Sequence, residues 1–361
     1  MRAVLLSSAL AVLLSLLGTR VAIGWITRRG FGQPIRADGP TTHHVKSGTP
    51  TMGGVVILLA ATAAYLTATL ATRGSPSASA WLLMLLFLGC GAVGFLDDFI
   101  KVRAQHNQGL SSRAKMAGQT LVAVVFGVLA TQLFADERGV NPASQYISTT
   151  HDVGIKLPLV VALVWIWFIV TASSNGANLT DGADGLLAGA SALILGAYAV
   201  VNIWQNNQLC GSARPTVVEA SCYEVRDPLD LAVFAAAIAA ACIGFLWWNA
   251  KPARIMMGDV GSLAIGGALA GLAIMSRTEI LMVVIAGLFV FETACVLLQM
   301  GYFKLTRRLT GTGRRIFRIA PIHHHFEHLG WDEVTVVIRF WMIAAICVVA
   351  GLGIFYASWL A

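Results

Sequence analysis

The sequence predicts an all-α polytopic membrane protein in which ten transmembrane helices form a single domain over residues 1–361. Of the 361 residues, 57% are hydrophobic and only 12% are charged, about half the charged fraction of an ordinary soluble domain. Apolar runs of roughly 20 residues, enough for a helix to cross the hydrocarbon core, recur along the chain. Because these runs are continuous and do not alternate, they exclude a membrane β-barrel. The composition also excludes a soluble enzyme, a disordered protein and a disulfide-rich secreted scaffold.

The ten expected spans follow one another with short connections. They cover Ala3–Trp25, Gly53–Thr72, Ala80–Phe95, Met116–Ala135, Leu157–Ala172, Leu186–Trp204, Leu229–Trp248, Gly261–Met275, Ile280–Phe303 and Val336–Leu360. The first could be read as a signal peptide, since Arg2 precedes the apolar run Ala3–Leu17. No clear small-residue cleavage site follows that run and nine further spans do, so we expect a retained transmembrane helix.

The basic residues predict the orientation of the spans. With ten spans both termini lie on one side, and the connections alternate between two faces. Sixteen of the 25 Lys and Arg residues fall in connections on one face and seven on the other. The basic excess marks the first face as cytoplasmic, which places both termini outside. The net charge of +7 is therefore mostly a topology signal, and no nucleic-acid partner is expected without a basic soluble domain.

The six cysteines fall into two groups. Four lie within expected spans, where they would pack as small apolar side chains. These are Cys90, Cys242, Cys295 and Cys347. Cys210 and Cys222 share one outer connection and could form a disulfide in an oxidising compartment, a pairing that the sequence leaves open.

Acidic residues on the expected cytoplasmic side sit at span ends beside glycines. Asp97 and Asp98 are adjacent at the end of the third span, where two carboxylates could bind a divalent cation or share a proton. A helix end made soluble by two charges explains this pair equally well. The outer face holds eight further acids, which look scattered and solvated and receive no role. They are Asp136, Glu137, Asp152, Glu219, Glu224, Asp227, Asp230 and Glu279.

The connection between the fifth and sixth spans carries Asn178, Asp181 and Asp184 at intervals of three residues. If this segment is helical, the three side chains share one face and converge. An N-cap of the sixth span would explain only one of the acids, so a functional site is favoured. Asp259 opens the eighth span between glycines. Taken singly, it is best explained as an N-cap, although free amides at a helix start also suit phosphate.

Three adjacent histidines, His323, His324 and His325, follow a basic stretch in the last cytoplasmic connection. Successive side chains on an extended segment diverge, so a zinc ion bound by all three is not expected and phosphate is the better partner. The arginines at 314–318 are explained equally well as a solvated face that fixes topology. Glu292 lies in the middle of the ninth span, where we expect a hydrogen-bonded structural acid.

Carboxylates, Lys, Asn and His gathered on one membrane face suit Mg²⁺ and phosphate, because Mg²⁺ prefers hard oxygen ligands and shares them with substrate phosphates. This combination favours an enzyme that joins a soluble phosphorylated substrate to a membrane lipid. The alternative of a different class is a secondary transporter or lipid flippase. It predicts a midplane ion site and inverted repeats, and neither is visible in the sequence.

Five motifs together resemble those of the phospho-N-acetylmuramoyl-pentapeptide-transferase family, part of the superfamily of polyprenyl-phosphate sugar-1-phosphate transferases. They lie at residues 48–54, 95–101, 178–185, 257–262 and 320–327, and the resemblance extends over nearly the whole chain. The last motif has Ala-Pro-Ile before the histidines, which resembles the muramoyl-pentapeptide branch. The alternative within the superfamily is a UDP-N-acetylglucosamine polyprenyl-phosphate sugar-1-phosphate transferase.

The resemblance implies an active-site cleft on the cytoplasmic face of the bacterial inner membrane, and a homodimer. The implied reaction transfers phospho-N-acetylmuramoyl-pentapeptide from its UDP carrier to undecaprenyl phosphate, with release of UMP and with Mg²⁺ as cofactor. We expect the lipid phosphate to attack the β-phosphate directly, because acids clustered around Mg²⁺ need no covalent intermediate.

Matching the motifs also assigns roles to residues. The implied catalytic set is Asp97, Asp98, Asp259, Lys115, His323, His324 and His325. Asp259 and Asp181 would bind the metal, Asp97 would orient or deprotonate the lipid phosphate, and Lys115 would neutralise phosphate. The histidines would line the same cleft near the diphosphate or the sugar.

A second set of residues would bind the nucleotide substrate. It comprises Lys46, Asn178, Asp181, Gly182, Asp184, Asn249, Met256 and Gln299. The family commonly has Phe at the position of Met256, where an aromatic ring could stack on uracil. The basic stretch Lys304–Arg318 is also several residues longer than usual, so the sequence leaves open how the loop before the histidines is built.

Overall fold

The computed structural model describes residues 1–28, 49–104, 108–212 and 221–360. Its helices are α1 (Arg2–Arg28), α2 (Gly54–Thr72), α3 (Ala78–Ala104), α4 (Ser112–Val128), α5 (Leu159–Thr180), α6 (Leu186–Asn207), α7 (Pro228–Asn249), α8 (Gly258–Met275), α9 (Glu279–Ile285), α10 (Gly287–Thr310), α11 (Ile322–His328) and α12 (Glu333–Leu360). A π-helical turn, Leu129–Leu133, continues α4. Strands β1 (Tyr146–Ser148) and β2 (Asp152–Lys156) pair as an antiparallel hairpin.

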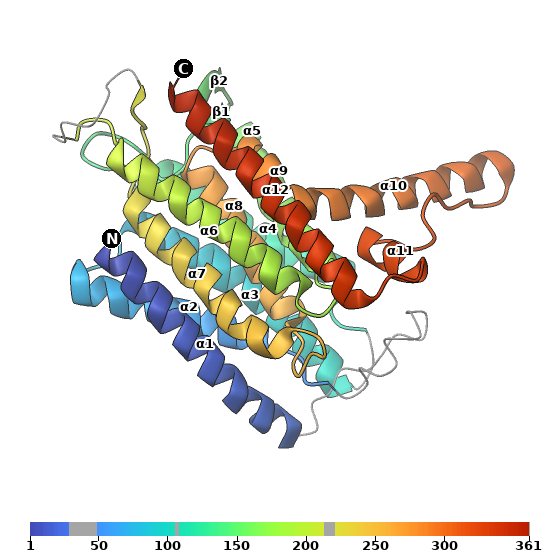
Figure 1. The fold of residues 1–361 in the computed structure, drawn as a ribbon. Coiled ribbons are helices and arrows are strands. Elements are labelled where there is room, and N and C mark those ends of the chain that lie inside the picture. The colour runs from blue at the N-terminus through green and yellow to red at the C-terminus, as the bar shows by residue number, and fades with distance from the viewer. Residues whose placement is uncertain (29–48, 105–107, 213–220, 361) are drawn as a thin grey trace.

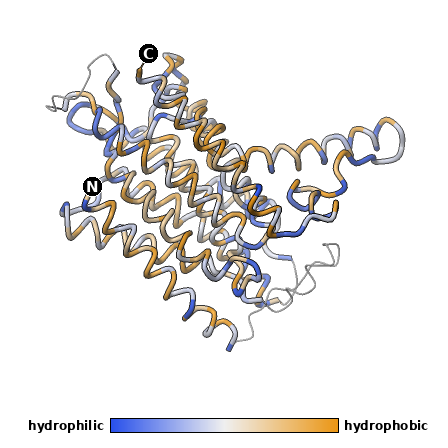
Figure 2. Tube along the Cα trace, in the orientation of Figure 1, coloured by the Kyte–Doolittle hydropathy of each residue, from blue (hydrophilic) through white to orange (hydrophobic). Residues whose placement is uncertain are grey.

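Within the described residues, ten helices are long and apolar enough to cross a membrane, which confirms the expected number. Most of them pack side by side, and both chain ends lie at the same end of the bundle (Figure 1). Hydrophobic residues run along the helices, while hydrophilic residues gather near the connections (Figure 2). The polar groups of the chain are therefore concentrated at the two ends of an apolar bundle.

Helix α8 lies at the centre of the bundle because it is built from small and apolar residues. Every residue from Val260 to Met275 is buried, and α8 packs against both α3 and α5. A Cβ on Gly266 would strike the backbone of Ser173 and Ser174 on α5. Such small residues let helix backbones approach closely inside a membrane, and this contact brings the polar ends of three helices together.

Two expected helix ends are wrong. The third span does not end at Asp97 and Asp98, since α3 continues to Ala104. The fifth span does not end at Ala172, since α5 continues to Thr180. In both cases the helix extends beyond its apolar run into residues that pack against neighbouring helices, so hydropathy alone stops too early.

The expectation of one continuous ninth span over Ile280–Phe303 is also wrong. Helix α9 ends at Ile285, Ala286 has non-helical torsion angles (φ −94°, ψ 27°), and α10 begins at Gly287. From there α10 runs away from the bundle, across the direction of α12 (Figure 1). A Cβ on Gly287 would lie 2.8 Å from Sγ of Cys347. The break thus depends on packing against α12, which the uninterrupted apolar pattern does not reveal.

The connections near the chain termini are more ordered than the all-α expectation allows. Cys210 and Cys222, whose pairing the sequence left open, form a disulfide. His151, in the turn of the β1–β2 hairpin, stacks on Tyr223 with ring centroids 4.5 Å apart. Strands this short are too brief to produce a recognisable alternation of apolar and polar residues, so no pattern predicted them.

Two of the acids expected to be solvated without a role are buried structural groups, which corrects that expectation. Asp230 is 2% exposed and forms an ion pair with Arg73. Glu279 is 5% exposed, and its carboxylate accepts hydrogen bonds from the Ser148 amide and the Trp165 indole, each at 3.2 Å. Burial raises the pKa of Glu279 to about 7.

Candidate active site

The candidate site lies where α3, α4, α5 and α8 meet, at the end of the bundle opposite the chain termini (Figure 1). Asp97 and Asp98 project from α3 and are 3% and 4% exposed. Asp259 lies in the first turn of α8 rather than at its N-cap position, which Met257 occupies. A Cβ on Gly94 would strike the backbone carbonyl of Asp259. Glycine at this position therefore allows α3 and α8 to touch where their acids meet.

Two lysines bind these acids together. Lys101 Nζ lies 2.5 Å from Asp97 Oδ2, 3.0 Å from Asp259 Oδ2 and 3.5 Å from Asp98 Oδ1. Lys115 Nζ, from α4, lies 2.6 Å from Asp259 Oδ2 and 4.0 Å from Asp97 Oδ2. Each lysine therefore bridges carboxylates from α3 and α8. We call these five residues the acid–lysine cluster.

The three carboxylates of this cluster fit a divalent cation. Asp97, Asp98 and Asp259 each offer an oxygen, and the three oxygens lie within 4.8 Å of one another. Hard oxygen donors of this kind suit Mg²⁺, which also recruits substrate phosphates as ligands. Three carboxylates against two ammonium groups leave one negative charge in excess. The donor set therefore matches a hard cation, and the lysines match the phosphates that would accompany it.

Backbone and amide donors hold each carboxylate in place. Leu110 N donates to Asp97 Oδ1 at 2.7 Å, and Val260 N donates to Asp98 Oδ2 at 3.1 Å. Asn178 donates from Nδ2 to Asp259 Oδ1 at 2.7 Å and to Ser262 Oγ at 2.8 Å. The expected contribution of Asn178 from α5 is thus seen as an amide that fixes the acid on α8.

Residues 178–184 do not form one helix, so the condition under which their three polar side chains would share a face is not met. Helix α5 ends at Thr180, Asp181 has φ −80° and ψ 51°, and Gly185 has a positive φ of 81°. A positive φ is incompatible with a continuous right-handed helix, and glycine permits it, so the chain makes a tight turn here before α6 begins. Asn178 and Asp184 consequently point to different partners, since the Asp184 carboxylate accepts a hydrogen bond from Ala253 N at 3.1 Å.

Asp181 lies beside the acid–lysine cluster at this turn. Burial raises the pKa of its carboxyl group to about 8, and the negative charges of Asp259 and Asp98 add to the effect. Among the described residues, Asp181 is not one of the three acids whose oxygens converge. The structure places this expected metal ligand within electrostatic reach of the cluster but outside its centre.

The loop between α7 and α8 carries the next group of predicted residues. Asn249 is 3% exposed and donates to the carbonyl of Ile255 at 2.9 Å. Met256 is half-buried, and its backbone bonds to Pro50 and Gly53. These residues shape the loop that leads into Asp259. Lys46, also expected to bind the nucleotide, lies outside the described residues.

The three histidines lie on helix α11, not on an extended segment as expected. His323 is completely buried, and its Nδ1 lies 3.0 Å from Glu292 Oε1. The other carboxylate oxygen of Glu292 accepts from Ile322 N at 3.0 Å. Glu292 is therefore a hydrogen-bonded acid, as the sequence predicts, but its partner is a histidine of the candidate site.

The helix sends the histidines in different directions. His323 Nε2 faces Gly182 and has no hydrogen-bond partner in the described structure, and a Cβ on Gly182 would strike this nitrogen. His324 also reaches Gly182 and pairs through Nδ1 with Glu327 at 3.1 Å. His325 instead accepts from Arg318 N at 3.1 Å. The turn beside Asp181 therefore meets two of the three histidines.

Gln299 supports the segment before the histidines. Its carbonyl oxygen accepts from the amides of Ile316 and Phe317, each at 3.0 Å, and its amide donates to the carbonyl of Phe317 at 2.9 Å. Both ends of the side chain are thus occupied by backbone groups. In this state Gln299 positions the loop and does not point into the acid–lysine cluster.

Sequence reasoning assigned no role to Lys101, although a signal was available. Lys101 follows Asp97 and Asp98 at i+4 and i+3, the spacing of neighbours on one helix face. The link between Glu292 and His323 left no such signal, because the two residues lie on separate elements and meet only in the folded chain.

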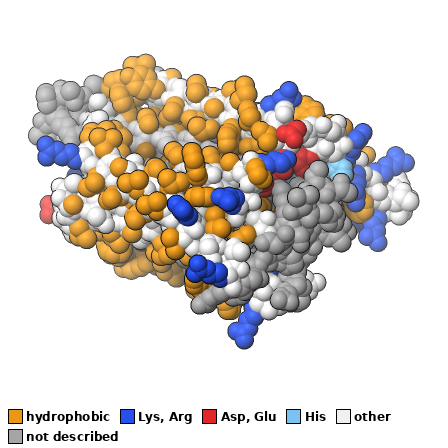
Figure 3. All heavy atoms as spheres, turned by 60° about the horizontal axis from the view of Figure 1, so that its bottom comes forward, with side chains coloured by type: hydrophobic (Ala, Val, Ile, Leu, Met, Phe, Trp, Pro, Cys, Tyr) orange, Lys and Arg blue, Asp and Glu red, His pale blue; other side chains and the backbone are white. Residues whose placement is uncertain are grey.

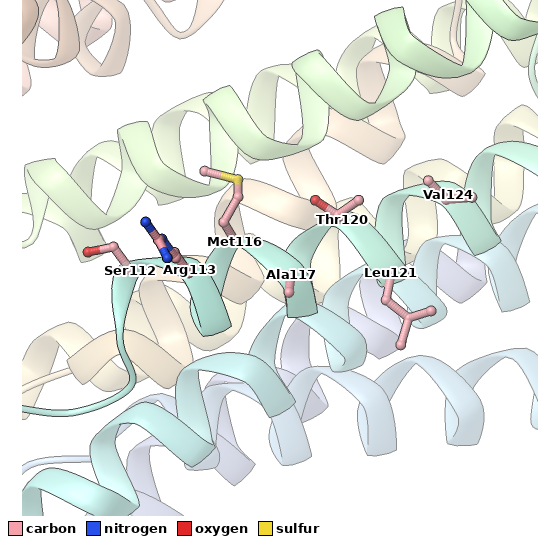
Figure 4. Close-up of a pocket in the computed structure, with 7 residues that line it drawn as sticks. All are labelled: Ser112, Arg113, Met116, Ala117, Thr120, Leu121 and Val124. Carbon is pink, nitrogen blue, oxygen red and sulfur yellow. The ribbon is translucent and has the colours of Figure 1, made fainter.

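A shallow groove of about 810 Å³ runs along one face of α4 (Figure 4). Its lining residues are Ser112, Arg113, Met116, Ala117, Thr120, Leu121 and Val124. Ser112 and Arg113 line it at the start of α4, and mostly apolar side chains line it toward the middle of the helix. Lys115, which reaches the cluster from the same helix, is not among its lining residues.

Comparisons with known proteins agree with this arrangement. Residues 80–277 match the model of glycosyl transferase family 4, and residues 46–58 match signature 1 of phospho-N-acetylmuramoyl-pentapeptide-transferase. A protein of that name from a Nocardioides species is 63% identical over 100% of both chains. Those from Kineococcus radiotolerans and Cutibacterium acnes are 56% and 52% identical, over at least 99% of each chain. The chain is therefore an enzyme that belongs to the phospho-N-acetylmuramoyl-pentapeptide-transferase family.

Proposed function

We propose that this protein transfers phospho-N-acetylmuramoyl-pentapeptide from UDP to undecaprenyl phosphate. The reaction releases UMP and forms lipid I, the first lipid-linked precursor of peptidoglycan. The observation that carries the proposal is the acid–lysine cluster at one end of a membrane bundle, where a lipid headgroup and a soluble nucleotide can meet. Full-length similarity to proteins named phospho-N-acetylmuramoyl-pentapeptide-transferase supports the choice of substrates.

We place the site on the cytoplasmic face of the bacterial inner membrane, with both termini outside. The end of the bundle that carries the site also carries Lys101, Arg103, Arg113 and Lys115, whereas both chain ends lie at the opposite end (Figure 1). An excess of basic residues is typical of cytoplasmic connections. A homodimer remains part of the proposal, on the strength of the family resemblance.

Asp97, Asp98 and Asp259 would hold Mg²⁺, and Asp181 would add a further carboxylate from the α5–α6 turn. When bound, the cation would neutralise charge on the diphosphate and hold its oxygens in position. The chain itself keeps the acids aligned, through Asn178 on Asp259 and through the backbone amides on the other two.

The lysines and acids then position the reacting phosphates. Lys101 and Lys115 would bind phosphate oxygens, and Asp97 would orient the lipid phosphate with Asp98 assisting. The second pKa of a phosphate monoester is near 6, so at neutral pH positioning is a larger demand than proton removal. An oxygen of the lipid phosphate attacks the β-phosphorus directly. The bond from that phosphorus to the oxygen of UMP breaks, and UMP leaves with the electron pair.

The loops around the cluster would bind the rest of the nucleotide substrate. Gly182 and Asp184 on one turn, and Asn249 and Met256 on another, surround the entrance to α8, with Lys46 and Gln299 completing the set. His323 and His324 face the Gly182 turn and would contact the diphosphate or the sugar. His325 would complete that side of the cleft.

The test is UMP release by purified protein supplied with UDP-N-acetylmuramoyl-pentapeptide, undecaprenyl phosphate and Mg²⁺. We expect turnover with this donor and none with UDP-N-acetylglucosamine. Asp259→Asn, which keeps the shape of the side chain, should abolish turnover. The matched control Asp136→Asn changes an acid at the opposite end of the bundle and should leave turnover intact. Turnover only with UDP-N-acetylglucosamine, or full activity of Asp259→Asn, would refute the proposal.

A further inference from the structure

The far end of α10 stands apart from the rest of the protein. Helix α10 runs out of the bundle (Figure 1), and its most apolar stretch is the least buried of the ten candidate spans. Apolar side chains remain exposed at its tip: Leu305 is 54% exposed, Leu309 74% and Ile316 50%. Exposed leucines at the end of a helix that leaves the bundle need an apolar environment other than this chain.

The same tip carries a concentration of unpaired positive charge. Its cations are Lys304, Arg307, Arg308, Arg314 and Arg315, all of them exposed. None of the five forms an ion pair within the described part of the chain, and no acid occurs between residues 304 and 318. A space-filling view shows Lys and Arg side chains crowded at one end of the molecule, beyond the histidines (Figure 3).

The tip is folded, which fixes how these charges are presented. Gly311 ends α10 with a positive φ of 75°, and the chain turns back so that Arg314 N donates to Thr306 Oγ1 at 2.8 Å. Gly313 packs on the ring of Phe303, and Gln299 holds the returning backbone at residues 316 and 317. The cations of the helix and those of the returning segment therefore belong to one surface. We call residues 304–316 the basic tip.

We propose that the basic tip binds the anionic phospholipid headgroups of the leaflet that faces the active site. Arginines beside exposed leucines match a membrane interface, where the apolar side chains enter the acyl region and the cations meet phosphates. A soluble acidic partner would match the charges but would leave the leucines unexplained. This inference goes beyond the transferase reaction and does not rest on it, since the surface lies on a different part of the chain from the acid–lysine cluster.

The test measures amide hydrogen exchange of the full-length protein in lipid nanodiscs. The two lipids are phosphatidylcholine alone and phosphatidylcholine mixed with phosphatidylglycerol. Each basic side chain near an anionic surface contributes roughly a fivefold preference, so peptides covering residues 304–316 should exchange at least about fivefold more slowly in the anionic nanodiscs. About 1 M salt, where the Debye length is about 3 Å, should remove the difference.

Two variants locate the effect. Arg307→Gln, Arg308→Gln and Arg314→Gln together should abolish the lipid-dependent protection, while peptides from α8 exchange as before. The control removes the same charge from exposed arginines of α1, with Arg2→Gln, Arg20→Gln and Arg28→Gln together, and should keep the protection. Equal exchange of the wild-type tip in both lipids would overturn the proposal and leave the surface to a soluble partner. Loss of protection in the control would overturn it as well, by showing that only net charge matters.

Discussion

The contact between Glu292 and His323 yields the sharpest prediction for the candidate site. A carboxylate can only accept hydrogen bonds, so Glu292 fixes the His323 proton on Nδ1 and receives the Ile322 amide on its other oxygen. The ring is thereby oriented with Nε2 toward the Gly182 turn. Glu292→Gln keeps the shape but offers an NH₂ group to one of these partners. The glutamine can then bond to both the Ile322 amide and the His323 ring only if the His323 proton moves from Nδ1 to Nε2.

The size of the effect follows from the hydrogen bonds. A bond to a charged group contributes about 1.5–3 kcal/mol and a neutral one about 0.5–1.5 kcal/mol, a difference of about 1–1.5 kcal/mol for each of the two bonds, so Glu292→Gln should lower stability by roughly 2–3 kcal/mol. If His323 contacts the phosphates in the transition state, the loss for its single bond gives a fall of about tenfold in kcat/KM. Glu292→Ala leaves the amide and the ring nitrogen unsatisfied, and should cost about 2–6 kcal/mol, enough to threaten folding.

The assay is UMP release at several concentrations of the UDP-linked substrate, with thermal unfolding measured on the same samples. Glu137→Gln, an exposed acid at the opposite end of the bundle, is the matched control and should behave as wild type. A folded Glu292→Gln protein with unchanged kcat/KM would refute the reasoning, because Glu292 would then only stabilise the fold.

Three further predictions concern other parts of the structure. Gly94→Ala should separate α3 from α8, destabilise the protein by about 1–3 kcal/mol and lower UMP release. Gly196→Ala, with open space around it, should do neither. Equal effects of the two substitutions on stability and UMP release would contradict the close contact. Because the folded-state pKa of Glu279 is raised from 4.5 to about 7, the native protein holds a proton that the unfolded chain loses. Stability should therefore fall as pH rises from 4.5 to 7, and Glu279→Gln should flatten the dependence of the unfolding temperature on pH over this range. An unchanged pH dependence in the variant would contradict the raised pKa of Glu279. Lys101→Gln should lower UMP release at least about tenfold by leaving buried carboxylates unpaired, and Arg103→Gln, two residues further along α3 and exposed, should serve as the control that keeps activity.

Much of the fold was predictable because each membrane span requires a long run of apolar residues. A helix must hide its backbone polar groups in lipid, so each apolar run long enough to cross predicts one helix, and the number of spans is confirmed. The break at Ala286 was not predictable in this way. It depends on the contact of Gly287 with Cys347 on α12, and a contact between distant residues leaves no mark on local hydropathy.

The site was predictable in its residue types and less so in its geometry. Glycine-flanked acids pointed to the correct end of the bundle, although α3 continues past them to Ala104, and Lys101 could have been added from its helical spacing to Asp97. The pairing of Lys115 with Asp259 across α4 and α8 required the fold. So did the turn after Asp181, where a glycine with positive φ overrides the three-residue spacing that suggested a helix.

The burial of α8 has a consequence for how such an enzyme can change. Its acid is fixed to a helix whose glycines touch neighbouring backbones, so the separation of the carboxylates cannot be tuned by small substitutions without loosening the core. Residues 250–254 and 311–321 of the neighbouring loops are exposed or half-buried instead, whereas Ile255 and Met257 are completely buried. Variation that adapts the enzyme to a different donor, or that lets it escape a nucleotide-like inhibitor, should therefore accumulate in these loops while the chemical centre stays fixed.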